Sequence, residues 1–180
     1  HFIVMTRSPY AYCEGTNRRG RSGLGYKSND TFGNITKGWI RECNYQIENI
    51  KLLNNVLHFT YEEFTENTDH IIDRILCFIP DLDTLNKTAS FMIHSLQGWI
   101  ERPVTNLNPV QIARLSDENI AEINRVLSKH PEIMAFFRYE YLDAAYNPIL
   151  RVRLILSRLY TQYIVRTLQR LSRRVKRLVQ

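Results

Sequence analysis

Arginine side chains at helical spacing are the strongest chemical signal in this sequence. Between residues 144 and 180 there are nine Lys and Arg residues and no acid. A guanidinium binds carboxylates and phosphates well, because its planar fork presents several N–H donors. A second basic group lies near the other end of the chain. We expect nucleic acid or another anionic partner to be bound by Arg166, Arg170, Arg173, Arg174, Lys176 and Arg177, together with Arg18, Arg19 and Arg21.

A set of acids repeats the spacing of the C-terminal arginines. Glu62, Glu66, Asp69 and Asp73 are separated by steps of four, three and four, as are Arg166, Arg170, Arg173 and Arg177. On a continuous helix this spacing places each set along one face. One hypothesis is that the two sets pair, within a chain or between copies, and so fix an orientation. The alternative is that each set is the solvated face of an amphipathic helix.

Residues typical of catalysis or metal binding occur without the spacing that these functions need. The segment Gly23 to Lys27 has glycines and a lysine but lacks the full phosphate-loop pattern. The histidines and cysteines form no close pair of the kind that zinc requires. Cys77 follows Ile75 and Leu76, and we expect it to be a buried thiol. We therefore predict a protein that is not an enzyme, with no cofactor and no metal.

The charge distribution is more informative than the net charge of +6. The chain has a basic beginning, an acidic middle and a basic end, which points toward contacts with partners. A hydrophobic content of 44% over 180 residues suits one globular domain with an extension, and excludes collagen-like or fully disordered chains. Three cysteines do not suggest a disulfide framework.

Helices are the elements that would have to position these side chains. Apolar residues recur at three and four positions over 41–59, 60–80 and 83–101, which predicts three helices. Thr60 and Glu63 predict a capping box at the start of the second helix. Further helices are expected to begin after Asn108, after Ser116 and at Pro131.

The two ends of the chain are expected to be extensions. Residues 1–40 hold six of the seven glycines and show no clear periodicity, which predicts an extended arm. Residues 148–180 predict one long basic helix with an apolar stripe. The sequence thus predicts an all-α fold: an irregular helical bundle over 41–147, a Gly-rich arm over 1–40 and this C-terminal helix. The arm would attach to its partner through Tyr10, Tyr12, Tyr26, Phe32 and Trp39.

These features favour a structural subunit of a larger assembly, such as a viral or phage particle or an organellar or ribosome-like complex. Two alternatives stay open: nonspecific nucleic-acid binding, and binding to a membrane surface through the C-terminal helix. No small-molecule ligand is expected. No apolar run is long enough to cross a membrane, so we expect an intracellular or particle-associated protein rather than an integral membrane protein.

Overall fold

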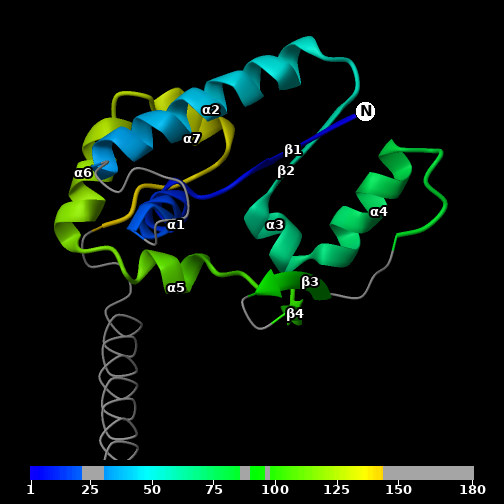
Figure 1. Ribbon diagram of the computed structural model, residues 1–180. Coiled ribbons are helices and arrows are strands. Elements are labelled where there is room, and N and C mark those ends of the chain that lie inside the picture. Colours follow the sequence, from blue (N-terminus) through cyan, green and yellow to red (C-terminus); the bar gives the residue numbers. More distant parts are fainter. Residues whose placement is uncertain (22–30, 86–89, 96–97, 144–180) are drawn as a thin grey trace, which may run out of the picture.

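The computed structural model describes residues 1–21, 31–85, 90–95 and 98–143, which are mostly helical (Figure 1). The described residues form seven helices and two small sheets. Along the chain the elements are β1 (Phe2–Thr6), α1 (Pro9–Arg21), α2 (Phe32–Leu52), β2 (Val56–Thr60), α3 (Tyr61–Glu66), α4 (Thr68–Phe78), β3 (Ser90–Ser95), β4 (Gly98–Pro103), α5 (Asn108–Ile112), α6 (Asp117–Leu127) and α7 (Pro131–Phe136). Among these helices, none is long and apolar enough to cross a membrane. The predicted basic helix over 148–180 lies outside the described residues.

Local capping signals placed the starts of α3, α6 and α7 correctly. The expected start after Asn108 is corrected: α5 begins at Asn108, and its N-cap is Leu107. The Thr60 hydroxyl accepts the Glu63 N–H at 3.1 Å, and the Glu63 carboxylate accepts the Thr60 N–H at 2.7 Å, which confirms the predicted capping box. Ser116 caps α6 in the same way, with Asn119 as its reciprocal partner. Pro131 begins α7, as predicted.

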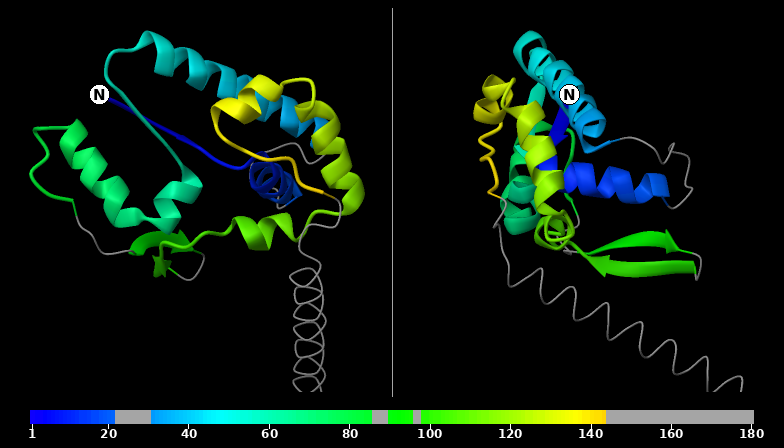
Figure 2. Two further views of the ribbon diagram at one scale, coloured as in Figure 1. Left: turned by 180° about the vertical axis from the view of Figure 1, so that it is seen from behind. Right: turned by 90° about the vertical axis from the view of Figure 1, so that its left-hand side faces the viewer.

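The hydrophobic core lies between α1, α2, α6 and α7, with α5 against α1 (Figure 2). Its centre includes Ile123, Leu127 and Ile133, all of which are fully buried. Tyr10 from α1 and Trp39 from α2 contribute the largest rings and are also almost fully buried. Burial of these apolar side chains is the main term that stabilises the fold.

The predicted extended arm over residues 1–40 is wrong for residues 2–21 and 31–40, which form β1, α1 and the first part of α2. Tyr10 is 1% exposed and Trp39 is 2% exposed, so both belong to the core of the chain itself. Large aromatics fill cores and interfaces by the same burial of surface, and the sequence does not separate the two. Gly33 permits a close approach, because a Cβ there would lie 2.8 Å from the Glu122 carboxylate. Tyr26 lies outside the described residues.

The expectation of a purely helical body is also wrong, because β2, β3 and β4 lie beyond residue 40. The segment predicted as a helix over 83–101 contains the antiparallel strands β3 and β4. Its apolar residues Met92, Leu96 and Ile100 are four apart, which suits one face of a helix. In the hairpin Met92 pairs with Glu101 and Ile93 pairs with Ile100, so Met92 and Ile100 lie on opposite faces. The helical spacing is therefore misleading here, and the pairing of the two strands determines the structure.

The other small sheet is a parallel pair that joins distant parts of the sequence. β1 pairs with β2 from Phe2 opposite Val56 to Thr6 opposite Thr60. α2, α3 and α4 pack against β2. The predicted helices over 41–59 and 60–80 are corrected here: the first gives way to β2 after Leu52, and the second divides into α3 and α4 at Asn67. The parallel strands bring residues 6–8 next to residues 60–62.

The core packing gives a first testable prediction. Ile123→Ala removes a fully buried side chain and should lower the free energy of unfolding by about 2–5 kcal/mol, because it leaves a cavity between α2 and α6. Urea denaturation followed by circular dichroism measures this change. Leu52→Ala is the control, since Leu52 is 78% exposed and should change stability by no more than about 0.5 kcal/mol. Equal effects of the two substitutions would contradict this packing.

Candidate functional site

Polar side chains gather where the two parallel strands end. β1 and β2 stop side by side at Thr6 and Thr60, and each strand leads directly into a helix, α1 or α3. Arg7 and Glu62 therefore lie close together, although 54 residues separate their strands in sequence. In open sheets of parallel strands, ligands bind beyond the carboxyl ends of the strands. This edge is the candidate functional site.

Arg7 is held in a fixed orientation at the end of β1. Its Nε donates to Asn108 Oδ1 at 2.8 Å, and its Nη2 donates to Gln111 Oε1. The guanidinium also lies over the Tyr61 ring, 4.2 Å from the ring centre. Burial lowers the pKa of Arg7, while Tyr61 and Glu62 act in the opposite direction. The side chain remains a cation, because an arginine pKa is far above neutral pH.

Glu62 connects four separate segments through its carboxylate. Its Oε1 accepts the backbone N–H of Ser8 at 3.0 Å and a hydrogen bond from Asn108 Nδ2. Its Oε2 accepts the Tyr139 hydroxyl at 3.1 Å. Burial, followed by the nearby charge of Glu62, raises the pKa of Tyr139 well above its usual range, so this hydroxyl stays protonated and donates. The starts of α1 and α5 and the chain after α7 are all tied to α3 by this one group.

His58 and Thr6 form a second polar contact, between the strands themselves. Their side chains are hydrogen-bonded, with 2.8 Å between Thr6 Oγ1 and His58 Nε2. The His58 ring also packs against Phe137. Burial lowers the pKa of His58, the carboxylate of Glu63 acts against this, and Arg74 adds to it. The lowered pKa favours the neutral imidazole.

Three further arginines lie on or against α1: Arg18 and Arg19 are on the helix, and Arg114 reaches Glu14 of the helix. The charge of Arg19, on α1, is close enough to lower the pKa of Arg7 further. Glu14 lies 3.8 Å from Arg18 and 3.5 Å from Arg114. We define the arginine cluster as Arg7, Arg18, Arg19 and Arg114.

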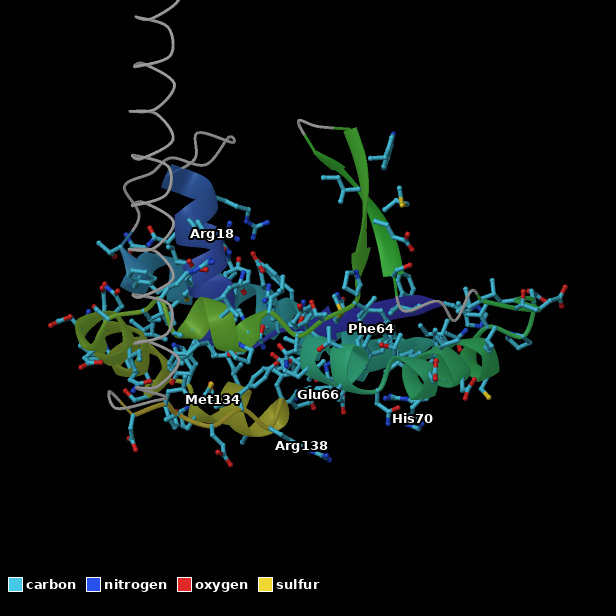
Figure 3. The ribbon with its side chains drawn as sticks, turned by 90° about the horizontal axis from the view of Figure 1, so that it is seen from below. Arg18, Phe64, Glu66, His70, Met134 and Arg138 are labelled. Atoms are coloured by element: carbon cyan, nitrogen blue, oxygen red, sulfur yellow. The ribbon has the colours of Figure 1, made fainter. Side chains whose placement is uncertain are left out.

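Two of the predicted anion-binding residues belong to this cluster. Arg18 and Arg19 are exposed on α1, where Figure 3 labels Arg18. Arg21 is the last residue of α1. The remaining predicted residues, Arg166, Arg170, Arg173, Arg174, Lys176 and Arg177, lie outside the described residues.

The predicted arm residues take other roles. The Tyr10 hydroxyl donates to Asn124 Oδ1 and accepts the Leu142 N–H, and Tyr12 donates to Glu42 at 2.9 Å. Trp39 Nε1 donates to the carbonyl of Arg7 at 3.0 Å, which fixes the backbone at the end of β1. Phe32 begins α2 and packs against the core. These contacts are within the chain.

The predicted acidic stripe does not form one helical face. Asn67 separates α3, which carries Glu62 and Glu66, from α4, which carries Asp69 and Asp73. Glu62 is half-buried. Glu66, which is labelled in Figure 3, is exposed and accepts a hydrogen bond from Asn106 at 3.3 Å. A step of four, three and four indicates a single face only when the helix is continuous.

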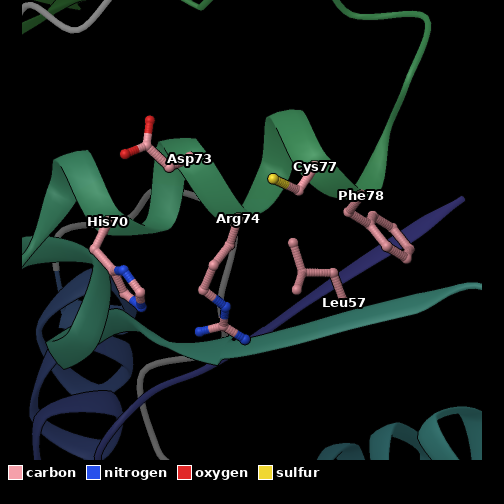
Figure 4. Close-up of a pocket in the computed structure, with 6 residues that line it drawn as sticks. All are labelled: Leu57, His70, Asp73, Arg74, Cys77 and Phe78. Carbon is pink, nitrogen blue, oxygen red and sulfur yellow. The ribbon is translucent and has the colours of Figure 1, made fainter.

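A shallow hollow of 430 Å³ lies between α4 and β2 (Figure 4). Cys77 opens onto it and is exposed, so the expectation of a buried thiol is wrong. Within the described part of the chain, no three His, Cys, Asp or Glu residues are grouped to hold a metal ion. The hollow is lined by Leu57, His70, Asp73, Arg74, Cys77 and Phe78.

Sequence analysis missed Arg7, which is the centre of the site. The signal available was an uncharged apolar run, residues 2–5, followed by Arg7 and by Pro9 at the start of a helix. That pattern fits a strand that leads into a helix. Asn108 was predicted only as a helix cap, and its contact with Arg7 depends on the folding of α5 against α1.

The contacts of Glu62 predict a large effect of a nearly isosteric substitution. Glu62→Gln replaces one acceptor oxygen by an NH₂ group that must face the donors of Asn108, Ser8 or Tyr139. We expect the free energy of unfolding to fall by about 1–3 kcal/mol, because a buried donor loses its partner. Glu66→Gln, on the exposed side of the same helix, is the matched control and should stay within about 0.5 kcal/mol of wild type in urea denaturation. The role of Glu62 is contradicted if both variants match wild type.

His58 predicts a defined dependence of stability on pH. Its folded pKa is lower than its unfolded pKa of about 6.5, so unfolding takes up a proton as the pH falls. The stability that His58 contributes is complete above about pH 7.5 and is lost as the pH falls below about 6.5. The difference in unfolding free energy between wild type and His58→Gln should therefore shrink between pH 7.5 and 5. His70→Gln, at an exposed position, is the control for the effect of removing a histidine. The prediction is contradicted if the difference in unfolding free energy between wild type and His58→Gln does not change with pH.

The chain was compared with protein families, curated proteins and solved structures. No family model, no curated protein and no solved structure matches it. The function must therefore be argued from the site itself.

Proposed function

We propose that this protein binds a small ligand carrying a phosphate or sulfate group, at the arginine cluster beside the end of β1. The observation that carries this proposal is the half-buried Arg7 guanidinium, which Asn108, Gln111 and Tyr61 hold in place at the end of β1. The charge of Arg19, on α1, is close enough to lower the pKa of Arg7. Two cations brought together repel each other, and an anion between them removes the repulsion.

The fixed orientation of Arg7 supports a specific ligand. Its described hydrogen bonds use two of the five guanidinium N–H groups. Asn108, Gln111 and Tyr61 hold the guanidinium plane in a fixed orientation. Binding of a ligand therefore costs little conformational entropy of the Arg7 side chain. Charged hydrogen bonds from a preorganised guanidinium to an oxyanion are strong and directional.

The geometry favours a small ligand over a long polyanion. Binding of a nucleic-acid backbone uses a groove or stripe of exposed cations that follows many phosphates. Arg7 is instead half-buried and lies beside the acidic segment that includes Glu62, Glu63 and Glu66. Such surroundings repel an extended polyanion and tolerate a single anionic group.

This proposal departs from the expectation of a structural subunit with no small-molecule ligand. That expectation depended on an arm over residues 1–40, and the described part of those residues belongs to the body. Its remaining support is the basic C-terminal segment over 148–180, predicted as a long helix, which lies outside the described residues. Nucleic-acid binding through that segment stays an outcome of the experiment below.

The proposal is tested by titrating the full chain with inorganic phosphate, with ADP and with a single-stranded oligonucleotide in a calorimeter. We expect saturable one-to-one binding of ADP. Arg19→Gln should weaken this binding by about ten-fold, since one charge-assisted hydrogen bond is worth about 1.5–3 kcal/mol. Inorganic phosphate should compete with ADP for the same site.

Arg125→Gln is the matched control, because Arg125 is exposed on α6 and does not belong to the cluster. Equal loss of affinity in the two variants, or no saturable binding of either small anion, would contradict the proposal. Tight oligonucleotide binding that depends steeply on salt and is unaffected by Arg19→Gln would favour the nucleic-acid alternative.

A further inference from the structure

A second hollow, which we call the basic hollow, lies between α2 and the turn that joins α6 to α7. It has a volume of 380 Å³. Five of its lining residues are on α2, three and four positions apart, so they share one face of the helix. α6 and α7 both pack against α2, as Figure 1 shows. The basic hollow is lined by Lys37, Ile40, Arg41, Asn44, Tyr45 and His130, none of which belongs to the arginine cluster.

The core fixes the backbone on both sides of the basic hollow. Ile40 is 5% exposed and belongs to the hydrophobic core, together with its neighbours Trp39 and Cys43 on α2. On the other side, the His130 N–H donates to the carbonyl of Leu127 at 2.8 Å, and His130 is the N-cap residue of α7. The walls are therefore in place before a ligand arrives, which lowers the entropic cost of binding.

Two cations in the basic hollow have no acid to pair with. Lys37 and Arg41 are one turn apart on α2, and like charges at this spacing repel each other. Among the residues that the structure describes, no carboxylate lies within ion-pair distance of either side chain. The acid nearest to the lining is Glu132, whose Oε1 is 3.5 Å from His130 Nδ1. An anion bound between Lys37 and Arg41 would relieve their repulsion.

The rest of the lining suits a flat apolar group. Ile40 contributes a buried apolar side chain, and Tyr45 contributes a ring that is 60% exposed. Asn44 and the Tyr45 hydroxyl can form hydrogen bonds at the margin of a ligand. Ligand pockets in proteins span about 300–1,000 Å³, so the volume of the basic hollow indicates a small ligand.

We propose that the basic hollow binds a small aromatic carboxylate. The carboxylate lies between Lys37 and Arg41, whose guanidinium can hold both of its oxygens. The ring packs on Ile40 and against the exposed face of Tyr45. The charge of Glu132, beside His130, disfavours a doubly charged phosphate ester more than a singly charged carboxylate. This site is separate from the arginine cluster and does not depend on the function proposed there.

The test is a titration of the isotope-labelled full chain with naphthoate, followed by the amide signals in NMR spectra. The signals of Arg41, Asn44 and His130 should shift in a saturable way. Acetate has the charge without the rings, and naphthalene methanol has the rings without the charge. Each of these should bind at least about ten-fold more weakly than naphthoate, because each lacks one half of the recognition.

Arg41→Gln should weaken naphthoate binding by about ten-fold, because it removes a charge-assisted hydrogen bond. Lys51→Gln is the matched control, since Lys51 is exposed in the last turn of α2 and does not line the basic hollow. Arg19→Gln should leave naphthoate affinity unchanged, which separates this site from the arginine cluster. The proposal is overturned if naphthoate does not saturate these signals, if naphthalene methanol binds as tightly, or if Arg41→Gln and Lys51→Gln have equal effects.

Discussion

The carboxylate of Glu62 is the contact on which the arrangement of this molecule depends. It receives the Ser8 backbone N–H, the Asn108 amide and the Tyr139 hydroxyl, which come from three segments spread over more than a hundred residues. Each of these donors is partly removed from water, so each needs an acceptor. A charged acceptor with two oxygens satisfies all three at once. The hydrophobic core stabilises the helices, but Glu62 determines how their ends meet.

Arg7 is oriented as a consequence of this arrangement. Asn108 donates to Glu62 through its NH₂ group and accepts from Arg7 through its oxygen, so the acid and the base are connected through one amide. Gln111, one turn later on the same segment, accepts the second Arg7 hydrogen bond. The strand end, the helix start and α5 therefore form one polar network. Because such networks are cooperative, Arg7 is held in position before any ligand arrives.

Sequence analysis was accurate where a signal is local and failed where pairing is distant. The capping boxes at Thr60 and Ser116 involve residues three apart, so their chemistry is visible in the sequence. The pairing of β1 with β2 joins residues that are 54 apart in the sequence. The residues of one strand do not indicate which segment it pairs with. Tyr10 and Trp39 were predicted to attach an arm to a partner, and this is wrong, because both are buried in the core of the chain itself. The glycines near them suggested flexibility, whereas Gly33 instead allows α2 to approach Glu122 closely.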